Sequence, residues 1–303
     1  MKFGAIDIGT NAARLLIGEV VTQDGHSFVK KISYTRLPLR LGIEVFETGK
    51  ISKKESTEFI KTIKAFKLIT EIFGVKKIRA VATSAMREAT NADRVIDRIY
   101  EETEVLIEVI SGQEEAELIF GTFFLLDIDR TAPFLVIDVG GGSTEISVFE
   151  EGRKVASKSF EVGTLRMLKD KVSPALWTDI HDWISKHVDL SSPHTIFGTG
   201  GNINKVHKLL GAAHMDPIQL NDMERLLSSM KSLTVDQRVD QFQLKPDRAD
   251  VIEPALEIYL YIMKELGVQE LIVPKIGLSD GVIYDLHQRS KGKVSSQKVY
   301  INP

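Results

Sequence analysis

Two spacings of apolar residues alternate along the chain, and together they predict an α/β fold. Short apolar runs bounded by turn residues predict strands at Lys76–Ser84, Glu104–Ser111 and His194–Gly201. Within Ser52–Gly74 the apolar residues recur every three or four positions, which predicts an amphipathic helix that Gly74 ends. Strands that alternate with such helices are typical of α/β proteins.

One strand–turn–strand phrase occurs twice. The first copy is "FGAIDIGTNAARLLIGEV" (Phe3–Val20), and the second is "FLVIDVGGGSTEISVFEEG" (Phe134–Gly152). Their alignment places Asp7 over Asp138 and Arg14 over Glu145. We therefore expect an internal duplication of an α/β domain, with the two hairpins facing across a cleft. The alternative is that Asp-x-Gly is simply a common turn at the end of a strand.

The domain boundary is expected just before the second copy. There "DIDRTAPF" (Asp127–Phe134) breaks a long apolar segment with charges and Pro133. A chain of 303 residues is long enough for two compact units. We expect an N-terminal domain of residues 1–127 and a C-terminal domain of residues 128–303.

Composition narrows the classes of partner. The 39 basic and 42 acidic side chains give a net charge of -3, which is not the field of a general nucleic-acid binder, so no DNA partner is expected. The absence of cysteine excludes disulfides, thiolate metal sites and a cysteine nucleophile. The sequence contains neither a signal-peptide pattern nor an apolar run that could span a bilayer. We therefore expect a cytoplasmic protein with no membrane partner.

The turn of the second copy is rich in glycine, and it predicts a phosphate loop. Gly140, Gly141 and Gly142 lack a Cβ, so their backbone N–H groups can approach an anion closely, with the Ser143 hydroxyl as a further donor. The spacing is not the Rossmann fingerprint, and the segment that follows alternates as a strand. No Gly-Lys-Ser/Thr follows either, which excludes a P-loop.

Charged residues of both copies point to a metal and phosphate site. Asp7 and Asp138 end apolar strands, where burial is costly without a positive partner. Carboxylates of this kind are natural ligands of Mg²⁺. If the duplication is real, Asn11, Arg14 and Glu145 point at the same cleft. Arg14 then has two possible roles: it forms an ion pair with Glu145, or it binds phosphate in a bidentate manner.

A further arginine follows a predicted strand in "ATSAMREATN" (Ala82–Asn91). Ser84 or Thr83 can cap the helix that begins there, and a helix start favours an anion. Arg87 projects from its first turn and is expected to bind phosphate. The alternative is an ordinary surface arginine.

The segment Ser111–Phe124 contains a candidate general base. Ser111 and Glu114 have the spacing of a capping box, which assigns Glu114 a structural role. Glu115 lies at the flank of the apolar stripe, and a carboxylate on a sheltered edge can act as a general base. From spacing alone, a glutamate that is merely solvated is the commoner case.

Several phrases, in this order, resemble the exopolyphosphatase and guanosine pentaphosphate phosphohydrolase family of the actin-like superfamily. They are "AIDIGTNAARLLI", "ATSAMREATN", "ISGQEEAELIFG", "VIDVGGGSTEI", "FEVGTLRM", "FGTGGN" and "DRADVIEPAL". The resemblance extends from about residue 4 to about residue 260. Each phrase alone is too short to indicate this family, but the whole set in this order is specific for it.

The resemblance implies two duplicated actin-like (ribonuclease H-like) domains with mixed sheets and an interdomain cleft. It also implies Mg²⁺-dependent hydrolysis of the terminal phosphate of inorganic polyphosphate or guanosine pentaphosphate, and a homodimer. It maps the residue that activates water onto Glu115. The expected metal ligands are Asp7, Asp138 and Glu145. The expected phosphate ligands are Thr10, Asn11, Arg14, Ser84, Arg87, Gly140, Gly141, Gly142 and Ser143.

Some positions depart from the family pattern. Ala12 stands where many members have a hydroxyl residue, and Asn202 stands where threonine is common. The phrase "GLSDG" (Gly277–Gly281) lacks a frequent arginine. The sequence ends at residue 303, so we expect no additional C-terminal domain and weak processive action on long polyphosphate.

Two other functions stay open at this stage. The altered loop residues are compatible with a non-catalytic sensor that binds polyphosphate or an alarmone. An actin-like kinase would share the two hairpins.

Overall fold

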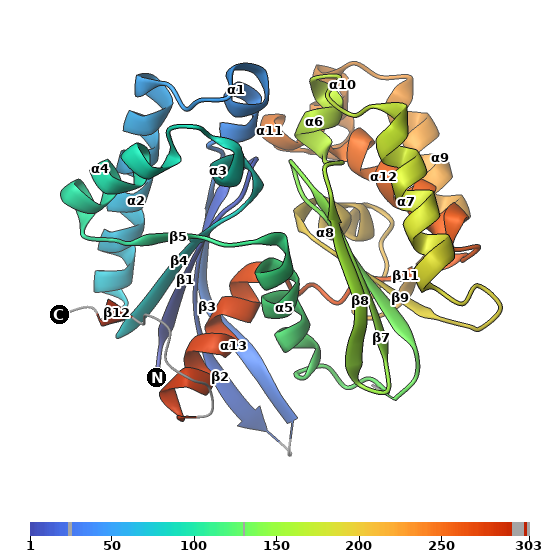
Figure 1. Ribbon diagram of the computed structural model, residues 1–303, viewed down its shortest axis with the longest axis horizontal. Coiled ribbons are helices and arrows are strands. Elements are labelled where there is room, and N and C mark those ends of the chain that lie inside the picture. Colours follow the sequence, from blue (N-terminus) through green and yellow to red (C-terminus); the bar gives the residue numbers. More distant parts are fainter. Residues whose placement is uncertain (24–25, 130, 293–299, 302–303) are drawn as a thin grey trace. The chain divides into compact units, whose positions relative to one another are not determined.

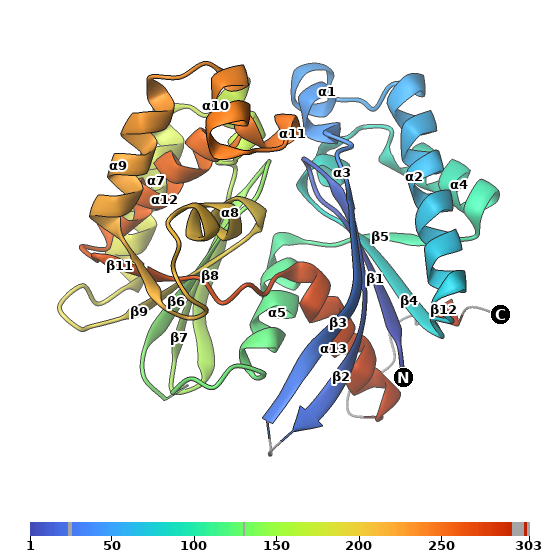
Figure 2. The same cartoon turned by 180° about the vertical axis from the view of Figure 1, so that it is seen from behind.

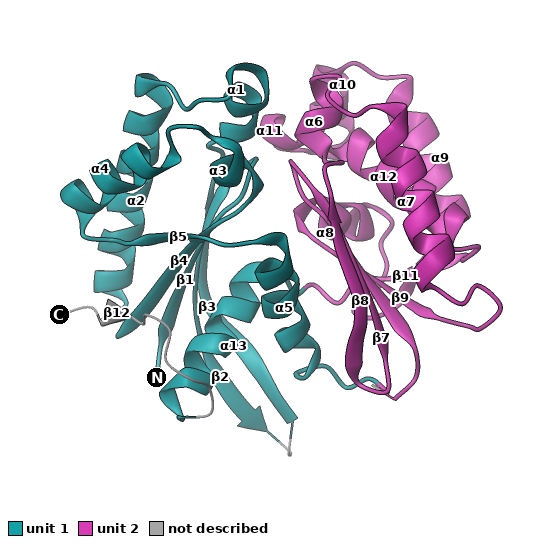
Figure 3. Ribbon diagram, in the orientation of Figure 1, with its two compact units in different colours: residues 1–128, 276–303 teal, residues 129–275 magenta. Residues whose placement is uncertain are grey.

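Each copy of the repeated hairpin begins the sheet of one of two units in the computed structural model (Figure 1). The structure describes residues 1–23, 26–129, 131–292 and 300–301. Unit 1 consists of Met1–Ile128 and Ile276–Pro303, and unit 2 of Asp129–Lys275 (Figure 3).

The expected boundary after residue 127 lies beside the observed one, but the expected C-terminal domain of residues 128–303 is too long. From Ile276 on, the chain belongs to unit 1. The reason is helix α13 (Leu278–Ser290), whose side chains Val282, Ile283 and Leu286 are fully buried. This helix packs on strands β1 (Phe3–Ile8) and β2 (Ala13–Gln23) of unit 1. Burying three such side chains stabilises this placement by about 5 kcal/mol.

The sheet of unit 1 grows outward from its first hairpin. Strands β1 and β2 are antiparallel with Asp7 opposite Arg14, β3 continues the antiparallel order, and β4 pairs with β1 in parallel. Among the described residues the order is β12-β4-β1-β2-β3, with β5 also on β4. The strands are β1 (Phe3–Ile8), β2 (Ala13–Gln23), β3 (His26–Leu37), β4 (Lys77–Ala82), β5 (Ile107–Val109) and β12 (Tyr300–Ile301).

Helices cover both faces of this sheet (Figures 1 and 2). Phe3 contacts His287 of α13, whereas a Cβ added at Gly4, the next residue of β1, would lie 3.5 Å from Cγ2 of Thr70 in α2. Successive residues of a strand point to opposite faces, so α13 and α2 lie on opposite sides. The remaining helices of the unit are α1 (Leu41–Thr48), α2 (Lys53–Ile72), α3 (Ser84–Glu88), α4 (Ala92–Thr103) and α5 (Gly112–Phe123).

Unit 2 repeats the topology. Its described strands are ordered β10-β11-β9-β6-β7-β8, with β6, β7 and β8 antiparallel and β9 parallel to β6. The core order β8-β7-β6-β9 matches β3-β2-β1-β4 of unit 1, which supports the expected duplication. The strands are β6 (Phe134–Val139), β7 (Thr144–Glu150), β8 (Arg153–Phe160), β9 (Thr195–Thr199), β10 (Pro217–Gln219) and β11 (Glu270–Ile272).

The core of unit 2 lies between this sheet and helix α12. Leu135, Ile137 and Val139 of β6 share one buried cluster with Tyr259 and Ile262 of α12. Helix α8 follows β9 directly and packs against it (Figure 2). The helices are α6 (Thr164–Leu168), α7 (Pro174–His187), α8 (Gly201–Leu209), α9 (Leu220–Lys231), α10 (Val235–Phe242), α11 (Pro246–Ala249) and α12 (Ile252–Glu265).

Most of the local predictions from the sequence correspond to an observed helix or strand. The helix expected in Ser52–Gly74 is α2, with the Ser52 hydroxyl as its cap and Gly74 at a φ of 63° just after it. The strand expected in Glu104–Ser111 shrinks to the three residues of β5, because Glu104 ends α4 and Ser111 already caps α5. Within the described part of the chain, no helix is both long and apolar enough to cross a membrane.

Candidate active site

A charged row crosses the sheet of unit 1 near the end of β1. Asp7 pairs with Arg14 across the hairpin, and Arg14 pairs with Arg36 of β3. The Nη1 atom of Arg14 donates a hydrogen bond to Oδ2 of Asp7 at 2.9 Å. Asp7 is only 5% exposed, and the guanidinium offsets the cost of burying its carboxylate. Neither reading of Arg14 from the sequence anticipated this pairing within its own hairpin.

The first hairpin loop is fixed by its backbone. The carbonyl groups of Thr10 and Asn11 accept hydrogen bonds from the amides of Gly42 and Arg40, each at 3.0 Å. These amides lie at the start of α1, so two expected phosphate ligands are held at a set position in unit 1.

The structure brings together two further candidates, Arg87 and Glu115. The Nη1 atom of Arg87 donates to Oε2 of Glu115 at 3.2 Å and to the carbonyl of Ile110 at 2.9 Å. The two charged residues are 28 positions apart in the sequence. The Glu115 side chain is 11% exposed. A cation suited to phosphate and a carboxylate suited to a general base therefore lie in contact.

The cap expected at the start of α3 is not formed. Thr83 occupies the capping position without a side-chain bond to the helix, and the Ser84 hydroxyl donates to Oε1 of Glu88 at 3.2 Å. The cap prediction is wrong because Ser84 lies inside the helix, where its hydroxyl reaches a side chain one turn further on. A contact between Ser84 and phosphate stays a prediction.

The equivalent row of unit 2 has Glu145 in place of Arg14 and Ser159 in place of Arg36. Thr199, Asp138, Glu145 and Ser159 are aligned across β9, β6, β7 and β8. Glu145 is only 3% exposed, and its Oε1 atom accepts hydrogen bonds from the hydroxyls of Ser143 and Ser159, both at 2.7 Å. Two hydroxyls thus hold one oxygen of this carboxylate in place.

A buried tyrosine joins strands β6 and β9 of this row through hydrogen bonds. The hydroxyl of Tyr259 donates to the carbonyl of Thr199 at 2.5 Å and lies 3.3 Å from the carbonyl of Ile137. Burial raises the pKa of Tyr259 well above its usual value, and the charge of Asp138 adds to this rise. Tyr259 therefore stays neutral and joins the ends of β6 and β9.

The glycine turn of unit 2 rests against α6. The carbonyl of Gly141 accepts from the amide of Leu165 at 2.8 Å, and that of Gly142 accepts from Nε of Arg166 at 2.5 Å. A Cβ at Gly163 would lie 2.5 Å from the carbonyl carbon of Gly142. The turn therefore packs so closely on residue 163 that only a glycine, which has no Cβ, fits there.

Two of these supporting residues were missed in the sequence. Arg166 lies in the phrase "FEVGTLRM", and its position in that phrase is the only sign in the sequence that it belongs to the site. Ser159 and Ser157 alternate along β8, and a polar alternation within a strand is the signal that could have found them. The expected site residues up to Glu115 lie in unit 1, and those from Asp138 on lie in unit 2.

Comparisons with known proteins find relatives that match nearly the whole chain. The Ppx/GppA phosphatase family matches residues 20–290. Exopolyphosphatase 1 of Mycobacterium tuberculosis is 25% identical over 308 residues, which cover 93% of this chain and 87% of that protein. Exopolyphosphatase 2 of the same organism is 27% identical over 324 residues, which cover 94% and 98%.

A solved structure with a similar fold is the crystal structure of the Aquifex aeolicus member of the Ppx/GppA family. It matches with a TM-score of 0.75 at 25% identity and covers 96% of this chain and 98% of that one. These similarities confirm the expected actin-like α/β fold class and the expected enzyme class, a hydrolase of phosphoanhydrides.

Proposed function

The chain belongs to the Ppx/GppA phosphatase family, and from this premise we propose that it removes the terminal phosphate from inorganic polyphosphate. The observation that carries the proposal is the contact between Arg87 and Glu115. It pairs a phosphate-binding cation with a carboxylate that can activate water. Guanosine pentaphosphate, which has the same kind of terminal phosphate, is a second proposed substrate. The comparisons offer no support for a non-catalytic sensor.

The proposed reaction is hydrolysis of one phosphoanhydride bond. The oxygen of water attacks the terminal phosphorus, the bond to the bridging oxygen breaks so that this oxygen leaves on the shortened polyphosphate, and Glu115 accepts one proton of the water. Arg87 and Arg14 neutralise the phosphate oxygens, and the loop at Thr10–Asn11 positions them. The loop at Gly140–Ser143 of unit 2 stays a predicted phosphate loop. Phosphoryl transfer passes through a loose transition state, so positioning and charge neutralisation supply most of the rate.

The acids of unit 2 fit a magnesium ion. Asp138 and Glu145 lie opposite each other on neighbouring strands, and oxygen ligands of this type suit Mg²⁺. The Glu145 carboxylate is already oriented by two hydroxyls. Asp7 of unit 1 is bonded to Arg14, and its role as a metal ligand stays a prediction. Mg²⁺, when bound, would supply positive charge to the phosphate oxygens.

Replacement of Ser159 by alanine tests the proposed metal site. Ser159→Ala removes one of the two hydroxyls on Glu145, and we expect the Mg²⁺ concentration for half-maximal phosphate release to rise about 10-fold. Turnover at saturating Mg²⁺ is expected to change little. A Mg²⁺ titration of initial rates measures both values.

Ser157→Ala is the matched control. Its hydroxyl lies on the same strand, two residues earlier, but is bonded to Ser147 at 2.8 Å. The Mg²⁺ requirement of this variant is expected to stay unchanged. Equal shifts in the two variants would contradict a role for Ser159 at the metal.

Phosphate release on three substrates tests the proposed function as a whole. Short polyphosphate, long polyphosphate and guanosine pentaphosphate are compared with Mg²⁺ and with excess EDTA. We expect release from short polyphosphate that EDTA abolishes. Calorimetric binding of polyphosphate with Mg²⁺ present but without release would favour a sensor, and labelled phosphate on an acceptor other than water would favour a kinase.

The cytoplasmic location and the homodimer stay predictions. Light scattering of the purified protein at several concentrations measures the second of these. A mass of twice that of one chain is expected.

A further inference from the structure

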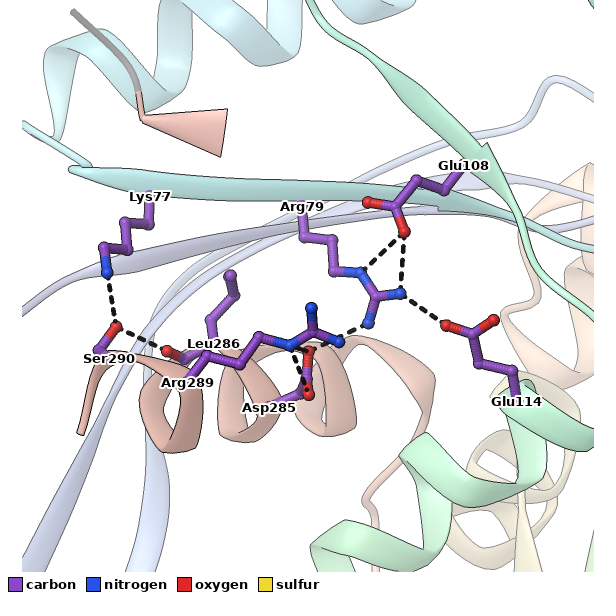
Figure 4. A network of polar contacts seen from close by, with 8 residues as sticks. All are labelled: Lys77, Arg79, Glu108, Glu114, Asp285, Leu286, Arg289 and Ser290. Carbon is purple, nitrogen blue, oxygen red and sulfur yellow. Dashed lines mark hydrogen bonds and ion pairs between the residues drawn. The ribbon is translucent and has the colours of Figure 1, made fainter. Parts of the chain in front are cut away.

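Arg79 is a buried arginine that contacts carboxylates of three separate elements (Figure 4). Its side chain is only 4% exposed. The Nη2 atom lies 2.7 Å from Oε1 of Glu114 and 2.9 Å from Oε2 of Glu108, and Nη1 lies 3.1 Å from Oδ2 of Asp285. Burial by itself lowers the pKa of Arg79, but the bonds to Glu108 and Glu114 and the charge of Asp285 raise it overall. The guanidinium therefore stays charged.

The three carboxylates connect Arg79 to different parts of unit 1. Arg79 itself lies on β4, Glu108 lies on the neighbouring strand β5, and Asp285 lies on α13. Glu114 lies in the first turn of α5, directly before Glu115. A planar guanidinium that bonds several carboxylates holds them in fixed directions, which a flexible ammonium group does not.

The contact with Glu114 replaces a bond expected from the sequence. The Ser111 hydroxyl accepts from the amide of Glu114, as in a capping box, but the Glu114 carboxylate accepts from Arg79. Glu114 is 38% exposed, whereas Arg79 is buried. The first turn of α5 is thus attached to the sheet through this side chain as well as through the chain itself.

We propose that Arg79 is a positioning residue: through Glu114 it fixes the first turn of α5, and with it the carboxylate of Glu115. This inference rests on the proposed function, in which Glu115 accepts a proton from the attacking water. A general base must lie within hydrogen-bond reach of its water, and a displacement of about 1 Å can cost about 10²-fold in rate. Arg87 orients the Glu115 carboxylate directly, and Arg79 orients the backbone that carries it.

The rival explanation is that the network around Arg79 only stabilises unit 1. Glu108 and Glu114 separate the two explanations because both bond to the same Nη2 atom. Only Glu114 belongs to the helix that carries Glu115. A purely stabilising network predicts similar effects of both substitutions on turnover, whereas positioning predicts an effect of Glu114 alone.

The first experiment compares Glu114→Gln with Glu108→Gln on short polyphosphate with saturating Mg²⁺. We expect Glu114→Gln to lower kcat about 10-fold with KM nearly unchanged, because the helix turn loses its ionic attachment. Glu108→Gln is expected to retain kcat, even if its midpoint of thermal unfolding falls. Equal losses of kcat in the two variants, or a loss confined to KM, would overturn the proposal.

A double-mutant cycle with Glu115→Gln gives the second measurement. If Arg79 acts through Glu115, adding Glu114→Gln to Glu115→Gln lowers kcat by less than about 2-fold. Multiplied losses overturn the positioning role but leave the role of Glu115 intact. Near-normal turnover of Glu115→Gln alone overturns the role of Glu115 as the base, and the positioning role of Arg79 with it, whereas a native chain that releases no phosphate overturns the proposed function. Glu114→Asp, which keeps the charge on a shorter side chain, is the substitute if Glu114→Gln does not fold, and the same outcomes decide.

Discussion

Replacing Glu115 by glutamine lowers the turnover of phosphate release from short polyphosphate by about 10²-fold or more, the usual scale for a positioned base. Glutamine has nearly the same shape as glutamate, and it can still accept a hydrogen bond from Arg87, which contacts Oε2 in the native protein. It cannot take a proton from water. Substrate affinity is therefore expected to change little, and the loss falls on kcat.

The measurement is steady-state phosphate release with saturating Mg²⁺, together with calorimetric binding of short polyphosphate. Glu117→Gln is the matched control, because Glu117 is an exposed residue of the same helix that accepts a bond from Gln113. Its turnover is expected to match that of the native chain. If Glu115→Gln kept near-normal turnover, the assignment of Glu115 as the base would be wrong.

The second large effect is expected at Gly281, where α13 crosses α5. A Cβ at Gly281 would fall far inside van der Waals contact with the backbone carbonyl of Leu118. Backbone cannot move aside as a flexible side chain can, so Gly281→Ala forces the two helices apart. Overpacking of a core costs 1–3 kcal/mol, and we expect about 3 kcal/mol or more here. Because α5 also carries Glu115, turnover is expected to fall with stability.

Chemical denaturation of the variant measures this loss of the free energy of unfolding. Gly277→Ala is the control at the start of the same helix, where an added Cβ meets no atom within 4 Å. This control is expected to unfold within about 0.5 kcal/mol of the native chain, as most surface substitutions do. A Gly281→Ala variant as stable as Gly277→Ala would show that the helices can separate without cost.

Much of the fold followed from local patterns. The alignment of the two copies of the hairpin phrase placed Asp7 over Asp138 and Arg14 over Glu145. The two hairpins have this same register, with Asp7 opposite Arg14 and Asp138 opposite Glu145. Alternation in strands and the spacing of three or four in helices reflect which face is buried, so they can be read without knowing the partners.

Other features depended on residues far apart in the chain. The return of α13 to unit 1 joins residues after 276 to strands before 23, and no break in composition marks it. The bond between Arg79 and Asp285 spans 206 positions. The cap predicted for α3 failed for a local reason, since Thr83 at the capping position makes no side-chain bond to the helix and the Ser84 hydroxyl donates to Glu88.

The sequence by itself determined the two hairpins, their shared register, the fold class and the short set of charged residues that includes Glu115. Only the tertiary structure decided the partner of each charge. Arg14 is bonded to Asp7, Arg87 to Glu115, and Glu114 to Arg79. The physical reason is that periodicity records whether a side chain is buried, whereas the partner that makes burial of a charge tolerable depends on which elements pack together.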